Sequence, residues 1–382
     1  MCGLGRHRLA LPSGLLSRRG GWAIEKEMKV SRETRPTVSI IIKALNEERH
    51  IAAAIESAIS ALGESDGEVI LADGGSSDRT VEIARRYPIL IVRLNRSEDR
   101  SCGSGAQLGF QYSRGSYLLL VDGDMRVHPG FLAAAIDTLS RNPSLAGVGG
   151  VLSEPSVVNE EYEQRRNRHD PDRHPGLVTR LDCSGLYRRT AIESIGYLTD
   201  RNLHGAEEFD LGARLHSAGW ALAKIDRPIA HHEVHTGSAY RLLLRRVLSR
   251  FACAPGELVR AAVGRRHFWF VMRNDRQWKI CLLVTGWWIT VLTTLTLPGW
   301  LSASAAVGIF LLPFAGMSLR WRSVRLGLYS VAVWNVTALC FLPGLLRPRI
   351  SPASWIESTV LRDLRHERDR TAHQRCQIPG RQ

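Results

Sequence analysis

Two aspartates separated by one glycine, Asp122-Gly123-Asp124, are the residues of this sequence best suited to chemistry. They directly follow Tyr117–Val121, an apolar run that predicts a buried strand. Open α/β sheets bind ligands at the carboxyl ends of their strands, and the glycine lets a ligand approach the backbone closely. Two carboxylates this close suit a divalent cation that also holds a diphosphate. Two acids after a strand also occur as a plain solvated turn, so other residues must support the metal interpretation.

Two earlier strand-end loops supply further polar groups. The strand predicted at Val38–Ile42 leads into an Asn-Glu pair that ends with Glu47, and the strand predicted at Glu68–Ala72 leads into Asp73 and a Gly-Gly-Ser-Ser-Asp run. A carboxylate at such a place can accept hydrogen bonds from a nucleobase or from ribose hydroxyls. Helix capping does not explain Glu47 or Asp73.

The elements that must position these loops alternate between strands and helices. The predicted elements that follow the first strand are a helix at 51–59, the strand at 68–72, a helix that starts near 77, a strand at 89–94, a helix at 106–112, the strand at 117–121 and helices at 186–195 and 211–218. Asn46 and Asp78 are placed to cap the first two helices. This alternation predicts an α/β fold with a doubly wound, mostly parallel sheet over residues 35–240.

Four stretches of the sequence, in the same order and spacing, resemble a known family. They are VSIIIKALNEE, LADGGSSDRT, GAQLGFQYSRGSYLLLVDGDM and LYRRTAIESIGYLTDRNLHGAEEFDLGARLHSAGW. The chain resembles the family 2 glycosyltransferases, which have the GT-A fold of nucleotide-diphospho-sugar transferases. The stretches stand for the opening strand with its Asn-Glu loop, the Asp-Gly-Ser-Ser-Asp-Gly-Thr loop, the approach to the DxD motif and the acceptor-side segment with its acidic pair. The resemblance covers about residues 36–235.

The resemblance implies a donor site and a metal site. Ala44, Glu47 and Asp73 match positions that line the nucleoside pocket of the donor. Asp122 matches a donor-binding position and, with Asp124, the ligands of a Mg²⁺ or Mn²⁺ ion on the sugar-nucleotide diphosphate. The expected cofactor is therefore Mg²⁺ or Mn²⁺.

The resemblance also implies a catalytic acidic pair, Glu207 and Glu208. Glu208 matches the general base, which in inverting transfer deprotonates the acceptor hydroxyl opposite the leaving diphosphate. A structural alternative is that Glu207 and Glu208 only stabilise the helix predicted from Leu211, because acidic residues in the first turn interact favourably with the helix dipole. His232 lies in a late histidine cluster with His231 and His235 and is a further candidate metal ligand, although histidines at such places are more often simply on the surface.

The sequence departs from the family pattern at several positions. Lys43 stands where many members have proline, Leu45 where many have an aromatic residue, and Gly74 where many have a second aspartate. These departures leave the nucleobase open. No Gln-x-x-Arg-Trp motif follows the acidic pair, so the resemblance implies non-processive transfer of a single sugar.

Charge and cysteine usage favour a membrane-associated protein on a reducing side. The chain of 382 residues has a formal net charge of +14, and many arginines flank apolar segments, which favours an anionic membrane surface over nucleic acid as the partner. Its seven cysteines are scattered without a CxxC pair, which argues against a zinc module and a disulfide scaffold.

Residues 280–346 are the apolar part of the chain and predict two to three membrane-embedded helices, split at Pro298-Gly299. Residues 241–275, with alternating basic and apolar positions, predict amphipathic interfacial helices. Residues 347–382 predict a basic tail, and residues 1–34 predict a disordered or mis-assigned N-terminal extension. Three full crossings would place the tail opposite the catalytic domain, so the topology of the last apolar run stays open.

The function predicted from these features is a metal-dependent, membrane-anchored glycosyltransferase. Its expected partners are a nucleotide-diphosphate sugar, a glycan or lipid-linked acceptor and membrane lipids, without nucleic acid. Its expected location is a bacterial-type inner membrane with the catalytic domain cytoplasmic. Two alternatives are a non-catalytic basic membrane protein that binds an anionic polymer, and a sugar-1-phosphate nucleotidyltransferase. The latter needs a Gly-rich phosphate loop with a basic residue just after the first strand, and Lys43, followed by Leu45-Asn46-Glu47, matches this poorly.

Overall fold

The computed structural model describes residues 37–63, 66–153, 159–167, 170–233 and 237–364. The predicted N-terminal extension, residues 1–34, lies outside these ranges. His235 and the end of the predicted basic tail, residues 365–382, also lie outside them.

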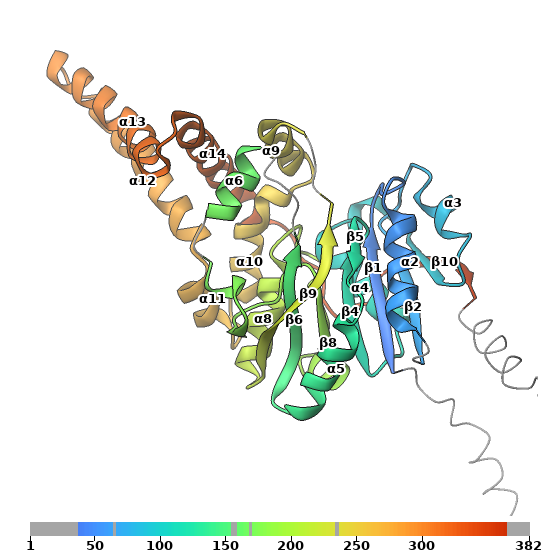
Figure 1. Ribbon diagram of the computed structural model, residues 1–382. Helices are drawn as coiled ribbons and strands as arrows, with labels where there is room; N and C mark the ends of the chain where they lie inside the picture. The colour runs from blue at the N-terminus through green and yellow to red at the C-terminus, as the bar shows by residue number, and fades with distance from the viewer. Residues whose placement is uncertain (1–36, 64–65, 154–158, 168–169, 234–236, 365–382) are drawn as a thin grey trace, which may run out of the picture. The chain divides into compact units, whose positions relative to one another are not determined.

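A mixed sheet forms the centre of the fold (Figure 1). Its strands are β1 (Val38–Ala44), β2 (Gly67–Asp73), β3 (Leu90–Leu94), β4 (Tyr117–Asp122), β5 (Met125–Val127), β6 (Leu145–Ser153), β7 (Gly176–Val178), β8 (Gly185–Arg188), β9 (Ala221–His232) and β10 (Ser358–Asp363). Their order is β10-β3-β2-β1-β4-β8-β6-β9-β5, with β7 paired to β9.

The helices of the described residues lie on both faces of this sheet and beyond one end of it. They are α2 (Ile51–Leu62), α3 (Thr80–Ala84), α4 (Cys102–Tyr112), α5 (Phe131–Arg141), α6 (Glu160–Asn167), α7 (Arg189–Ser194), α8 (Glu207–Ser217), α9 (Ala239–Leu248), α10 (Ala254–Ala262), α11 (Phe268–Asn274), α12 (Gln277–Leu295), α13 (Trp300–Trp321) and α14 (Val324–Leu346). Three short 3₁₀ turns, η1 (Ser97–Asp99), η2 (Pro171–Arg173) and η3 (Phe251–Cys253), accompany them.

The predicted α/β class is confirmed, but the sheet is less parallel than expected. β3, β2, β1 and β4 are parallel neighbours. Antiparallel pairs then join β8 to β4 and β6, and β5 and β7 to β9. The prediction of a helix over 186–195 is wrong in its first half, because Leu186 and Tyr187 are buried as part of strand β8 and only Arg189–Ser194 are helical.

Side chains of β1 alternate between two apolar cores. Ile40 and Ile42 pack with Ile51 and Ile55 of α2. Ile41 points to the other face, where it joins α4 and α8. This alternation is the period of two that a strand imposes, and it explains how a continuous apolar run serves a strand covered on both faces.

The predicted cap of the first helix is wrong. Helix α2 begins at Ile51 and is preceded by His50, whereas Asn46 lies four residues earlier in a left-handed conformation with φ of 59°. Asparagine tolerates this backbone better than most residues, so Asn46 serves the turn after β1 rather than the helix.

The apolar C-terminal segment forms α12, α13 and α14. Each of these helices is long and apolar enough to cross a membrane, judged by length and composition. The following residues differ from the predicted basic tail, because Ser358–Asp363 return to the sheet as β10 (Figure 1). β10 pairs with β3.

Candidate active site

The carboxyl ends of β2, β1 and β4 bring three predicted site residues to one edge of the sheet. Ala44 at the end of β1 is in register with Asp73 on β2, and the preceding residue, Lys43, is in register with Asp122 on β4. The strand pairing therefore places Ala44, Asp73 and Asp122 as the sequence predicted, at the edge where open α/β sheets bind ligands.

Helix α8 begins above this edge and points its first two residues at Lys43. The Lys43 ammonium lies 3.1 Å from Asp122 Oδ1, 3.2 Å from Glu207 Oε1 and 3.6 Å from Glu208 Oε1. Burial alone would lower the pKa of Lys43, but these three carboxylates raise it well above its usual value. The lysine is thus held as a cation inside the acidic cluster.

Two glutamates of the site have strongly raised pKa values. Burial and the neighbouring Glu208 raise the pKa of Glu207 to about 7, against the opposing effect of Lys43. Burial, Asp124 and Asp122 raise the pKa of Glu47 to about 7. Carboxylates crowded in this way stabilise a bound cation, because a cation removes their mutual repulsion.

Gly123 permits this crowding. A Cβ atom at Gly123 would lie 2.9 Å from the Cβ of Ala44 and 3.0 Å from the Cγ of Glu47. The two aspartates of the motif therefore approach Glu47 only because the residue between them has no side chain.

His232, the predicted late histidine, lies at the end of β9. β9 pairs with β5, which follows the aspartate pair directly, so that His232 is in register with Met125. Its Nε2 atom lies 3.4 Å from Asp124 Oδ2. Burial lowers the pKa of His232, but the hydrogen bond and charge of Asp124 outweigh it and raise the pKa overall.

Asp73 has a structural role that the sequence did not indicate. Its carboxylate accepts hydrogen bonds from the backbone N–H groups of Gly75 and Ser76, and it pairs with Arg93 at 3.4 Å. The side chain is fully buried. Asp73 therefore holds the shape of the second loop, and direct contact with a nucleoside would require this loop to move.

Asn46 and Asp78 join the first two loops. The amide oxygen of Asn46 accepts the backbone N–H of Ser77, and Asp78 accepts the backbone N–H of Glu48. Asp78 also accepts from the backbone and hydroxyl of Thr80, the first residue of α3, but Arg79 rather than Asp78 occupies the N-cap position of that helix.

The residues present fit a hard divalent cation only in part. Among the described residues, no three His, Cys, Asp or Glu side chains come together as a metal site. Asp124 and His232 nevertheless lie 3.4 Å apart, and the charges of Asp124 and Asp122 both act on the nearby Glu47. Magnesium is commonly held by one or two carboxylates together with substrate phosphates, and this donor set fits that arrangement.

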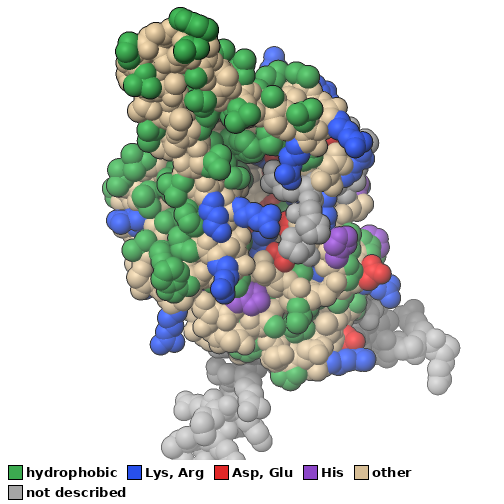
Figure 2. All heavy atoms as spheres, turned by 90° about the vertical axis from the view of Figure 1, so that its left-hand side faces the viewer, with side chains coloured by type: hydrophobic (Ala, Val, Ile, Leu, Met, Phe, Trp, Pro, Cys, Tyr) green, Lys and Arg blue, Asp and Glu red, His purple; other side chains and the backbone are tan. Residues whose placement is uncertain are grey.

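A large cavity connects this edge to the apolar helices. Its volume is about 2330 Å³. Its walls include the predicted residues Ala44, Glu47, Asp122, Asp124, Glu207, Glu208 and His232, together with Trp321 of α13 and Trp334 of α14. Figure 2 shows Lys and Arg side chains gathered around a hollow in which acidic side chains are visible. Arg273 of α11, Arg276 directly before α12 and Arg320 of α13 line the cavity as well.

Sequence reasoning missed the part that Lys43 takes in the site. The signal was present, because lysine stood where the resembled family commonly has proline. The contact between α8 and β1 could not be predicted from the sequence, because more than 150 residues separate the two elements. This contact brings the glutamates of α8 to Lys43.

The comparison with family models agrees with this site. Residues 39–196 match the model described as glycosyl transferase family 2. Residues 39–196 are therefore similar to family 2 glycosyltransferases, in agreement with the predicted family. The match includes the strand ends that carry Lys43, Asp73 and the aspartate pair.

Individual relatives match about half of the chain. Glycosyltransferase AglE of Haloferax volcanii is 35% identical over 181 residues, which are 46% of this chain and 60% of that protein. The N-acetylglucosaminyl-diphospho-decaprenol L-rhamnosyltransferase of Mycobacterium tuberculosis is 25% identical over 218 residues, 47% of this chain and 70% of that protein. The chain spans less than two thirds of the length of the first curated relatives it matches, at 62% and 60%.

A solved structure confirms the GT-A fold. The mannosyltransferase PcManGT from Pyrobaculum calidifontis, in complex with GDP-Man and Mn²⁺, superimposes with a TM-score of 0.54 at 14% identity. The superposition covers 84% of this chain and 93% of that chain.

Proposed function

We propose that this chain transfers a single sugar from a nucleotide-diphosphate sugar to a glycan or lipid-linked acceptor at a membrane. The transfer inverts the anomeric configuration and requires Mg²⁺ or Mn²⁺. The observation that carries this proposal is the convergence of the Asp122-Gly123-Asp124 motif and the Glu207-Glu208 pair on one cavity. An aspartate pair for the donor diphosphate and a separate glutamate for the acceptor are the two parts that inverting transfer needs.

The donor side is assigned to the strand ends. Ala44 and Glu47 would line the nucleoside pocket, and the Asp73 loop would close it through Gly74 and neighbouring backbone. Asp122 and Asp124, with His232, would hold the divalent cation, which when bound neutralises the charge on the leaving diphosphate. Asp124 and His232 are already within 3.4 Å of each other, which favours a shared role.

The acceptor side is assigned to the start of α8. Glu208 accepts the proton of the acceptor hydroxyl. Glu207 contacts Lys43 at 3.2 Å and so holds the lysine next to Glu208. Lys43 balances the charge of the pair, because its ammonium group also lies 3.6 Å from Glu208, which is 20% exposed.

The position of the cavity supports a membrane-borne acceptor. The cavity reaches from the acidic pair to α13 and α14, so an acceptor attached to a lipid could extend from the bilayer to Glu208. The name of the Mycobacterium relative describes transfer to a diphospho-decaprenol carrier, which supports a lipid-linked acceptor here. The arginines along the cavity suit an anionic acceptor of this kind.

A nucleotidyltransferase fits the site less well. Such an enzyme needs a free cation after the first strand to hold phosphates. Lys43, the cation at that place, is paired with Asp122, Glu207 and Glu208.

The test is a panel of sugar nucleotides applied to the detergent-solubilised protein, read as nucleoside diphosphate release and as a shift of the melting temperature. We expect one UDP- or GDP-linked sugar to stabilise the protein when Mn²⁺ or Mg²⁺ is present. Equal stabilisation in EDTA would contradict the metal-bridged donor site. Release of pyrophosphate from a nucleoside triphosphate and a sugar phosphate would favour the nucleotidyltransferase instead.

A further inference from the structure

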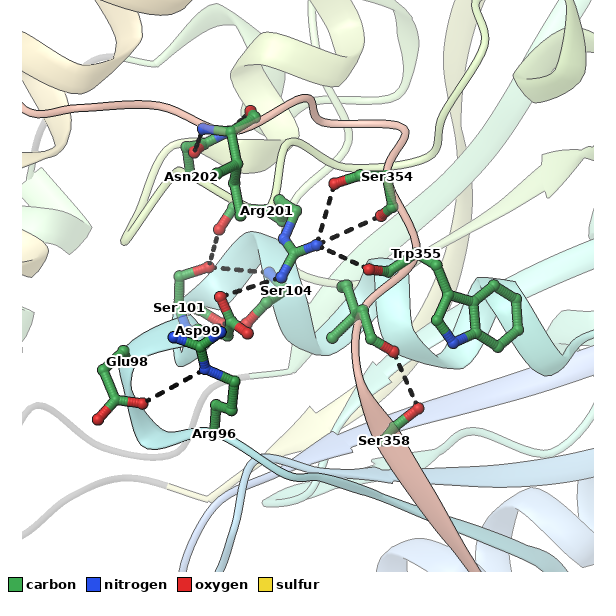
Figure 3. A network of polar contacts seen from close by, with 12 residues as sticks. Arg96, Glu98, Asp99, Ser101, Ser104, Arg201, Asn202, Ser354, Trp355 and Ser358 are labelled. Atoms are coloured by element: carbon green, nitrogen blue, oxygen red, sulfur yellow. Dashed lines mark hydrogen bonds and ion pairs between the residues drawn. The ribbon is translucent and has the colours of Figure 1, made fainter.

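The chain returns to the catalytic sheet directly after its last apolar helix. Residues Ser358–Asp363 form β10, which pairs antiparallel with β3 at the edge of the sheet. Ile356 is fully buried in the apolar core that side chains of β2, β3 and α4 form. Arg201, in the loop before α8, donates to Ser354 and to the carbonyl oxygen of Trp355 (Figure 3). The residues after α14 are therefore part of the catalytic fold.

The C-terminal end of α14 packs on η3 and α10, and α10 in turn packs on α8 of the catalytic domain. A Cβ atom at Gly344 would lie only 2.3 Å from the carbonyl oxygen of Cys253, so the last turns of α14 pack tightly on η3. Directly after the helix, Arg347 pairs with Glu257 of α10 at 3.5 Å. No stretch of chain is left between the end of α14 and the domain that could cross a bilayer core of roughly 30 Å.

The N-terminal end of α14 touches the same domain at a different place. Gln164 of α6 donates to the carbonyl oxygen of Leu326 at 3.0 Å and to Ser330 Oγ at 2.7 Å. The hydroxyl of Tyr329 donates to Glu161 Oε2, also of α6, at 2.7 Å. The helix has 23 residues and a length of about 34 Å at 1.5 Å per residue. Since both of its ends contact the catalytic domain, α14 lies across that domain.

α12 and α13 differ from α14 in burial and in charge. Only 17% and 6% of their most apolar windows are buried inside the protein, against 28% for α14. Arg273 and Arg276 precede α12, and Arg320 and Arg322 end α13, whereas the turn between the two helices, residues 296–299, has no charged residue. Basic residues at both outer ends of a hairpin are typical of two crossings that start and finish on the same side.

We propose that α12 and α13 cross the membrane as a hairpin and that α14 lies along the membrane surface, between the bilayer and the catalytic domain. The C-terminal segment then remains on the side of the catalytic domain, which β10 requires. This arrangement resolves the conflict that three crossings would create with the basic residues after α13. It does not depend on the proposed reaction.

The partner of the α14 surface is the headgroup region of an anionic bilayer. α9 packs beside α14 through Tyr240 and Tyr329, whose ring centroids are 5.4 Å apart. Leu248 of α9 is 75% exposed and Leu339 of α14 is 78% exposed. α9 also carries Arg245 and Arg246 among its leucines. Leucines with adjacent arginines are the composition of helices that lie in the plane of an anionic interface.

The experiment maps three epitope tags in the full-length protein in sealed vesicles of both orientations, by protease digestion. The first tag is inserted between Asn142 and Pro143, in an exposed loop of the catalytic domain. The second is inserted between Pro298 and Gly299, in the turn between α12 and α13, and the third is added after Gln382. We expect the loop tag and the C-terminal tag to be digested in the same vesicles, and the turn tag only in vesicles of the other orientation. A C-terminal tag digested together with the turn tag would establish three crossings and overturn the proposal. Digestion of all three tags in the same vesicles would exclude the hairpin.

A second measurement locates α14 itself. Gly344 of α14 packs on the backbone of Cys253 of η3, and Cys340 lies four residues before Gly344 on the same face of α14. Mild oxidation of intact membranes should therefore join Cys253 to Cys340, detected as a linked peptide by mass spectrometry, and Cys340→Ser should abolish it. For the tag experiment described above, detergent-permeabilised vesicles are the control, because every tag should be digested in them. No linked peptide in the unaltered protein would mean that α14 leaves the catalytic domain.

Discussion

The ammonium group of Lys43 and the carboxylate of Glu207 lie 3.2 Å apart, although 164 positions separate them in the chain. The side chain of Lys43 is 13% exposed and that of Glu207 is 5% exposed, so this ion pair is nearly buried. Removing one partner of a buried pair leaves the other charge without compensation and typically costs about 3–5 kcal/mol. Lys43 therefore links the end of β1 to the start of α8.

Lys43→Met should consequently lower the melting temperature and abolish transfer, because Asp122, Glu207 and Glu208 would then repel one another. Lys43→Arg keeps the charge and should retain part of both properties. The measurements are thermal unfolding and sugar transfer in the same detergent. Wild-type stability in Lys43→Met would show that the carboxylates become protonated at little cost, and that the pair does not hold the two halves together.

Asp124→Ala should abolish both metal-dependent donor binding and transfer. Asp124 is nearly buried next to His232, and the donor diphosphate would lose the carboxylate that links it to the cation. Donor binding is measured by calorimetry with and without Mn²⁺. Asp137→Ala, which removes an exposed aspartate of α5, is the matched control and should change neither property. Donor binding that survives in Asp124→Ala and still depends on metal would move the cation to other ligands.

Glu208→Gln should separate binding from catalysis. The amide keeps the shape of the side chain but cannot accept a proton, so transfer should fall by roughly 10²-fold or more while donor affinity is unchanged. Glu193→Gln on the surface of α7 is the control. Full activity in Glu208→Gln would transfer the role of base to Glu207 or Asp210. Loss of donor binding would instead show that the acidic pair is structural and stabilises the start of α8.

The strand ends that carry the site could be predicted from sequence because they depend on local patterns. Apolar runs followed by Asp73 and by the aspartate pair located β2 and β4, and parallel pairing then placed their ends together. The role of Asp73 could not be predicted, because its hydrogen bonds to Gly75 and Ser76 depend on the conformation of the loop. An acid at a strand end looks the same in sequence whether it faces a ligand or its own backbone.

Contacts between distant segments account for what the sequence did not reveal. β8 was mistaken for part of a helix, since its burial between β4 and β6 removes any alternation of polar and apolar residues. β10 was mistaken for a basic tail, because Ser358–Asp363 is only a short segment whose partner strand lies more than 250 residues earlier. The three apolar helices were predictable from composition alone, whereas the way α14 lies against α6 and α10 depends on Gln164 and Glu257.

Arg201→Ala should loosen the C-terminal segment from the catalytic domain. The guanidinium of Arg201 is 5% exposed, pairs with Asp99 at 3.0 Å and donates to Ser354 at 3.1 Å (Figure 3). Its loss leaves a carboxylate and hydrogen-bond acceptors without their partner, which we expect to lower the free energy of unfolding by about 1–3 kcal/mol. Limited proteolysis should then cleave the segment around β10 faster than in the parent protein.

Arg96→Ala is the matched control for this change. Arg96 is 58% exposed and contacts Glu98 at 3.9 Å, so its removal should alter stability by less than about 0.5 kcal/mol. Equal protease resistance in Arg201→Ala and the parent would show that β10 stays paired with β3 without this arginine.

His267 should make the protein sensitive to mild acid. Burial lowers the pKa of His267 below its usual 6.5, with Arg214 and Arg265 adding to the effect and Asp210 opposing it. Below pH 6.5 the unfolded chain therefore binds a proton more readily than the folded one, and stability falls as the pH drops from 6.5 through the lower folded pKa. Above pH 6.5 the stability contributed by neutral His267 is fully present.

His267→Gln cannot be protonated, so the loss of melting temperature between pH 7.5 and about 5.5 should be smaller than in the parent protein, given the usual histidine pKa. His128→Gln, a change at an exposed histidine, should leave the acid sensitivity as it is. An unchanged pH profile in His267→Gln would show that His267 becomes protonated as easily in the folded protein as in the unfolded chain.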